Sequence, residues 1–75
     1  MSWNHRILAH EIEGGVIFQV HEVYYKDDLP THYTQNPIPI AGESIKDINW
    51  AIYEITKCTK KPILWAGDRF PESYK

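Results

Sequence analysis

Residues 16–25 constrain the fold more than any other part of this 75-residue chain. The segment reads VIFQVHEVYY and is dense in the β-branched and aromatic residues that favour strands. Two glycines precede it, Gly14 and Gly15, and paired glycines supply the positive φ that a tight hairpin needs. Residues 3–12 lie on the other side of these glycines and predict the partner strand. The chain therefore begins with a β-hairpin.

The register of this hairpin has two alternatives. A two-residue turn of the paired glycines sets Ala9 opposite Val20. A three-residue loop that also includes Glu13 sets Arg6 opposite Glu22. We favour the second register, because it pairs opposite charges and collects apolar side chains on one face. That face would carry Leu8, Ile12, Val16, Phe18 and Val20, and the other would carry Trp3, Ile7, Val23 and Tyr25 with Gln19 and His21.

The second half of the chain predicts a third strand and a helix. Residues 26–30 form a turn, residues 32–34 a short strand, and residues 36–40 an edge strand or an extended connector, since two prolines remove ladder donors. Ser44 is a good N-cap, and Asp47 three residues later forms an imperfect capping box. A helix ending near Lys60 follows, with an apolar stripe that we expect to be buried. The stripe consists of Ile45, Ile48, Ile52 and Ile55.

These elements predict an α+β fold of the order β-β-β-α. We expect a three-stranded antiparallel meander with one long amphipathic helix across one face, and residues 62–65 as a possible short fourth strand. Residues 1–65 would form a single domain and residues 66–75 a polar C-terminal tail. A chain this short buries only about 60% of its unfolded surface, so its core is thin, and oligomerisation is a common remedy.

Composition limits the classes of function. The net charge is −2, and the only basic cluster, Lys57, Lys60 and Lys61, lies where cations complement a helix C-terminus. We therefore expect no nucleic-acid partner. Cys58 is the single cysteine, which is consistent with a reducing compartment. No signal peptide and no apolar run of membrane-spanning length is apparent, so we expect a cytoplasmic protein.

No pattern in the chain predicts catalysis. The histidines show no metal-binding spacing, so we expect no metal and no cofactor. Cys58 would lie at a helix C-terminus, where the dipole raises the pKa of a thiol, and it suits a core position better than a nucleophile. We therefore interpret the sequence as that of a protein that is not an enzyme. A small enzyme that uses the polar strand cluster of Arg6, His21 and Glu22 is kept as the third hypothesis.

Trp50 is the most informative residue for function. At about 100° per residue it projects nearly opposite the isoleucine stripe, with Lys46, Tyr53 and Lys57 on the same outer side. Aromatic residues make up 13% of the chain, more than one thin core can hide. Either this face is an interface, most naturally of a homodimer, or the tail covers Trp50, or Trp50 is simply exposed. The tail would use Trp65, Phe70 or Tyr74.

A string of short motifs carries a family resemblance. It comprises Trp3-Asn4 with Arg6, then residues 21–25, Asn36-Pro37, residues 42–44 and residues 61–64. This string resembles a family of small, uncharacterised bacterial proteins over residues 3–64. The resemblance implies a bacterial origin and a cytoplasmic location but no chemistry.

A looser resemblance is to HicB-like antitoxin domains. Gly14-Gly15-Val16 and Gly42-Glu43-Ser44 match the turn and the helix start of that family. Its segment Pro-(Asp/Glu)-Leu-Pro-Gly-Cys is absent, and residues 21–25 stand in its place. The leading hypothesis is thus a self-associating protein–protein interaction module. The alternative is an antitoxin-like regulator that binds a toxin.

Overall fold

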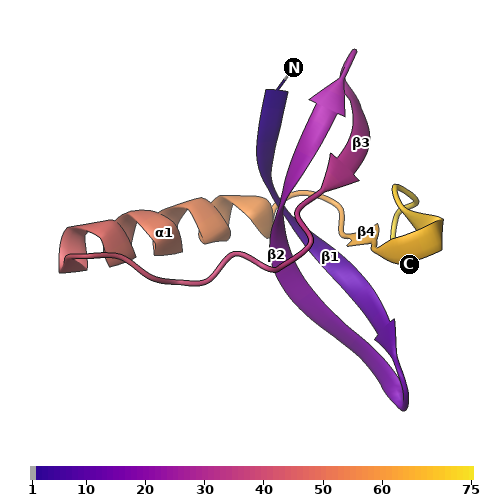
Figure 1. The fold of residues 1–75 in the computed structure, drawn as a ribbon, viewed down its shortest axis with the longest axis horizontal. Coiled ribbons are helices and arrows are strands. Elements are labelled where there is room, and N and C mark those ends of the chain that lie inside the picture. Colours follow the sequence, from indigo (N-terminus) through magenta and orange to yellow (C-terminus); the bar gives the residue numbers. More distant parts are fainter. Residues whose placement is uncertain (1) are drawn as a thin grey trace.

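The computed structural model describes residues 2–75 and contains one four-stranded sheet with one α-helix (Figure 1). The strands lie in the order β3-β2-β1-β4. The α+β class and the antiparallel β1–β2–β3 meander are as predicted, but the sheet is mixed, because β4 runs parallel to β1. No helix within residues 2–75 is long and apolar enough to span a bilayer. The elements are β1 (Ser2–Ile12), β2 (Gly15–Lys26), β3 (Leu29–Tyr33), α1 (Ile45–Cys58), β4 (Leu64–Trp65) and the 3₁₀ helix η1 (Gly67–Arg69).

The β1–β2 register differs from both predicted alternatives. Ile12 pairs with Gly15, so the turn contains only Glu13 and Gly14, and Gly14 takes the positive φ of 90°. Arg6 then lies opposite His21 rather than Glu22. The predicted charge pair was wrong because Gly15 belongs to the strand and not to the turn.

This register also changes which side chains share a face. Odd residues of β1 now lie beside even residues of β2, so the two predicted groupings were wrong. Leu8 shares a face with Val23 and His21, and all three are fully buried. Phe18 and Ile12, both predicted for the face of Leu8, are exposed. One face thus combines the apolar core with buried polar groups.

The third strand begins earlier than predicted. Asp27 and Asp28 form a two-residue turn with φ of 52° and 65°, a left-handed conformation that aspartate tolerates better than most residues. β3 therefore starts at Leu29 and includes Pro30. β3 is an edge strand, where proline is tolerated, and its pairing with β2 shifts by one residue beside Pro30.

The C-terminal segment covers the core face. Leu8, Val23 and Leu64 form the buried cluster, and Phe70 packs against it. The segment returns beside β4 through hydrogen bonds from Trp65 N to Glu72 O (2.8 Å) and from Tyr74 N to Ile63 O (2.8 Å). Residues 66–75, which we expected to be a polar tail, thus fold back onto the sheet.

Helix α1 begins as predicted. The Ser44 side chain accepts a hydrogen bond from the Asp47 N–H (3.3 Å), and Asp47 Oδ2 accepts one from the Glu43 N–H (3.1 Å). The helix runs to Cys58, two residues short of the predicted end. Thr59 caps it, and its N–H donates to Lys57 O.

The position of α1 differs from the prediction. Figure 1 shows the helix extending away from the sheet rather than across one of its faces. Only its C-terminal residue, Cys58, is fully buried, whereas Ile45 and Ile52 are 74% and 49% exposed. The expected burial of the isoleucine stripe was therefore wrong for Ile45 and Ile52, whereas Ile48 and Ile55 are partly buried. The observed register places polar His5 and Glu22 on the sheet next to the helix, and covering them with isoleucine would desolvate polar groups at a cost.

Candidate functional site

The predicted interaction surface is exposed, but only one of its four residues, Trp50, lines the cleft between α1 and the strands. The other three are Lys46, Tyr53 and Lys57. Tyr53 is 61% exposed and lies beneath the Lys57 ammonium, 5.0 Å from its ring centroid. Lys57 also forms an ion pair with Glu54 (2.7 Å), which raises the pKa of Lys57. Lys46 lies on the same exposed side. Trp50 is 58% exposed, but it lines a cleft between α1 and the strands.

The C-terminal segment does not cover Trp50. Its aromatic rings are used on the sheet instead, where Tyr74 contacts Phe18 and Trp65 at centroid distances of 5.3 and 5.0 Å. Phe70 contacts Tyr33 at 4.8 Å. Figure 1 shows this segment and α1 on opposite sides of the strands. Tail packing therefore does not explain the exposed tryptophan.

The predicted polar cluster of Arg6, His21 and Glu22 is not brought together at one point. Arg6 and His21 are cross-strand partners on the core face. Glu22 follows His21 in the strand, so its side chain lies on the opposite face and lines the cleft. Since the three side chains do not converge, they offer no acid–base couple that includes Glu22.

Arg6 is a buried structural group. It is 8% exposed, and its guanidinium donates to Tyr25 Oη (2.7 Å) and to the carbonyl oxygen of Pro62 (2.6 Å). Among residues 2–75 the only ion pair joins Lys57 to Glu54, so no carboxylate pairs with Arg6. Arg6 thus ties β1 to the chain that leads from α1 into β4.

His21 is held by hydrogen bonds at both ring nitrogens. Nδ1 lies 2.9 Å from Thr34 O, and because a carbonyl oxygen only accepts, Nδ1 carries the proton. Nε2 lies 2.9 Å from His10 Nε2, which must therefore donate when both rings are neutral. Burial lowers the pKa of His21. This pair fixes two imidazole tautomers inside the sheet rather than presenting a base to solvent.

Neither a metal site nor a reactive thiol is found in residues 2–75. No group of three or more ligating side chains comes together there. Cys58 is buried, its thiol donates to Ile55 O (2.9 Å), and burial raises its pKa. A thiol with a raised pKa is a poor nucleophile at neutral pH.

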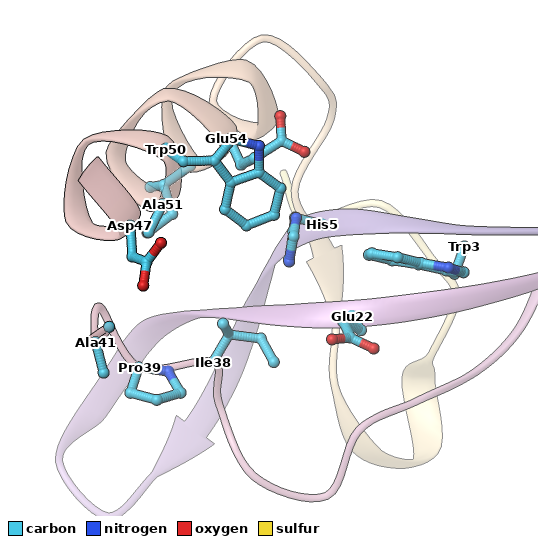
Figure 2. A pocket seen from close by; sticks show the side chains of 12 residues that line it. Trp3, His5, Glu22, Ile38, Pro39, Ala41, Asp47, Trp50, Ala51 and Glu54 are labelled. Atoms are coloured by element: carbon cyan, nitrogen blue, oxygen red, sulfur yellow. The ribbon is translucent and has the colours of Figure 1, made fainter. Parts of the chain in front are cut away.

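One cleft has a volume of about 400 Å³ and lies between α1, the connector before it and the N-terminal half of β1 (Figure 2). Trp50 projects from the helix toward His5, and Trp3 lies beyond His5 on β1. The Trp3 and His5 rings meet edge to face, with centroids 5.5 Å apart. Three acidic side chains complete the lining, namely Glu22, Asp47 and Glu54.

Sequence reasoning found Trp50 and Glu22 but did not connect them, and it missed the other polar and aromatic members of this lining. One signal was present, because Asp47, Trp50 and Glu54 are spaced by three and four residues and so share one helix face. The contribution of Trp3 and His5 depends on the hairpin register, which the sequence did not decide.

Comparison of the chain with protein-family models, with curated proteins and with solved structures finds no match.

Proposed function

We propose that this protein is a non-enzymatic protein–protein interaction module that self-associates through the face of α1 that points away from the strands. The observation that carries the proposal is the exposure of Ile45 and Ile52, two of the four isoleucines of the stripe. In a soluble domain this stripe normally faces the core, but here Ile45 and Ile52 face solvent. A helix with an apolar face of this kind is stabilised chiefly by packing, so it favours a partner.

The surface area of the chain supports this proposal. A compact monomer of 8.8 kDa exposes about 4,800 Å², whereas this chain exposes 5551 Å². Its radius of gyration of 12.9 Å also exceeds the roughly 11 Å of a compact domain of this length. The excess area is close to the ~800 Å² that each partner buries in a standard interface.

A second copy of the chain suits this face. The residues of α1 that point away from the strands, called the outward strip below, include no charged side chain. Two copies could therefore pack these strips together without like-charge repulsion at the centre of the interface. A symmetric pair needs only one self-complementary surface. The strip consists of Ile45, Ile48, Asn49, Ile52 and Thr56, and Lys46, Tyr53 and Lys57 form one of its borders.

Light scattering across a concentration series tests the proposal. We expect the wild type to have a dimeric mass and Ile52→Lys to be a folded monomer, because the lysine places a charge in the centre of the strip. Ile17→Lys is the matched control, since Ile17 is a partly exposed isoleucine on β2, away from the helix. It should remain a dimer, and circular dichroism should show that both variants are folded.

A wild type that remains monomeric at the highest soluble concentration would overturn self-association. A dimer that survives Ile52→Lys would place the interface elsewhere. A stable complex with a small basic protein, formed by a monomeric wild type, would favour the antitoxin-like alternative instead.

A further inference from the structure

The cleft beside Trp50 combines aromatic, acidic and aliphatic side chains. Trp3 and Trp50 provide aromatic surface, and Glu22, Asp47 and Glu54 provide carboxyl groups (Figure 2). Among residues 2–75 neither lysine nor arginine lines it. It lies on the side of α1 that faces the strands, so it is separate from the outward strip proposed for self-association.

The fold keeps this cleft open. The N–H of Ile38 donates to Val20 O (2.8 Å), which ties the connector to β2 before the chain turns toward α1. At the helix start, Gly42 packs so closely against the Cβ of Asp47 that a side chain at position 42 would clash. These contacts tie the connector to β2 and the start of α1 to the connector, and the cleft lies between the helix and the sheet. The space left between them, about 400 Å³, is within the range of small-ligand sites.

The carboxylates of the cleft retain hydrogen-bonding capacity. Glu22 Oε1 accepts from Tyr24 Oη (2.8 Å), which raises the pKa of Tyr24, and Asp47 Oδ2 accepts from the Glu43 N–H (3.1 Å). Glu54 Oε2 lies 2.7 Å from Lys57 Nζ. Each of these bonds occupies one oxygen of a carboxylate that has two. The cleft therefore offers both fixed acceptors and a local excess of negative charge.

We propose that this cleft binds an organic cation, that is, an ammonium or guanidinium group on an apolar stem. Carboxylates form charge-assisted hydrogen bonds with such a group. The face of a tryptophan ring attracts a cation, and tryptophan is the best side chain for this. Ile38, Ala51 and Ile55 line the same cleft and would contact the apolar stem. The proposal does not depend on self-association.

Nuclear magnetic resonance titration of the full chain tests this proposal. The probes are butylammonium and butylguanidinium, with butyrate and butanol as the matched anion and neutral molecule. We expect the indole N–H signals of Trp3 and Trp50 to shift with the two cations only, and the affinity to fall as salt rises. A blocked lysine peptide forms a separate arm. Binding of this peptide without binding of free butylammonium would assign the cation to a protein side chain.

Two pairs of variants locate the site. Trp50→Leu should weaken cation binding by about tenfold, as expected for the loss of one cation–π contact, whereas Tyr53→Leu should not, because Tyr53 does not line the cleft. Glu22→Gln should weaken it by a similar factor, and Glu11→Gln should not, since Glu11 does not line the cleft. Heteronuclear correlation spectra confirm that each variant is folded.

Three results would overturn the proposal. The first is the absence of any shift with either cation and with the lysine peptide. The second is an equal response to butanol, which would indicate an apolar cleft without charge selection. The third is an equal loss of affinity in Trp50→Leu and Tyr53→Leu. Light scattering on the same samples keeps this result separate from the test of self-association.

Discussion

The two sides of this molecule treat their apolar residues in opposite ways. On the core face, Leu8, Val23 and Leu64 are buried beneath a segment that returns from the far end of the chain. On the other side of the strands lies α1 (Figure 1). It also has an apolar stripe, yet Ile45 and Ile52 remain in solvent. Both stretches are amphipathic. Only the core face is covered by another segment of the same chain.

A chain of 75 residues has few segments that can cover an apolar surface, and here the C-terminal segment covers the sheet rather than the helix. The C-terminal segment covers the core face with Phe70, which contacts Tyr33, and reaches the other face of the sheet with Tyr74, which contacts Phe18. Helix α1 is held chiefly at its C-terminal end, where Cys58 is buried. The closed side therefore contains the buried core, and the open side leaves apolar side chains exposed.

The largest effect is expected from a direct comparison of the two sides. Leu8→Ala should lower the free energy of unfolding by about 3 kcal/mol, because it leaves a cavity in the core. Ile52→Ala should lower it by less than about 1 kcal/mol in the monomer, because its side chain is half exposed. Urea denaturation at a concentration where both variants are monomeric measures the two values. Equal losses would contradict the division into a closed and an open side.

A smaller effect on the free energy of unfolding should follow the protonation of His21, which is buried on the closed side. Burial lowers the pKa of His21 below its ordinary value of about 6.5. Between the lowered pKa and 6.5 the unfolded chain binds more protons than the folded chain, so the free energy of unfolding falls as pH falls through this window. For one proton the slope is at most about 1.4 kcal/mol per pH unit.

Urea denaturation from pH 7.5 downward, with closely spaced steps, measures this contribution. His21→Gln should show a shallower loss of stability in the window than the wild type. The exposed His32 provides the control, and His32→Gln should follow the wild type. Parallel curves for all three proteins would show that His21 does not set the pH dependence.

Local signals in the sequence predicted most elements correctly. The hairpin, the Ser44 cap and the α+β class follow from turn residues, capping chemistry and hydrophobic periodicity, which act over a few residues. The register did not follow, because Glu13, Gly14 and Gly15 allow three different turns, two of two residues and one of three. A one-residue shift exchanges the two faces. That shift moved Glu22 away from Arg6 and beside His5.

The open helix could not be predicted from its own pattern. A stripe of isoleucines predicts burial, but it does not say whether the cover is the same chain or another one. The cleft, likewise, could be predicted only in part from the pattern of the helix. Its helical members, Asp47, Trp50 and Glu54, were readable from spacing, whereas the approach of Trp3 required the register and the course of the connector.

The smallest effect should separate the two sides most clearly. Ser44→Ala removes the side-chain cap of α1 and should cost about 1 kcal/mol, confined to the helix. Hydrogen exchange should therefore become faster for the amides of α1 and remain unchanged for those of β1 and β2. Ser73→Ala, in the closed region, is the matched control and should leave α1 unchanged. If Ser44→Ala instead accelerates exchange equally in helix and sheet, the two sides unfold as one cooperative unit, and the open helix is more firmly coupled to the core than its exposed isoleucines imply.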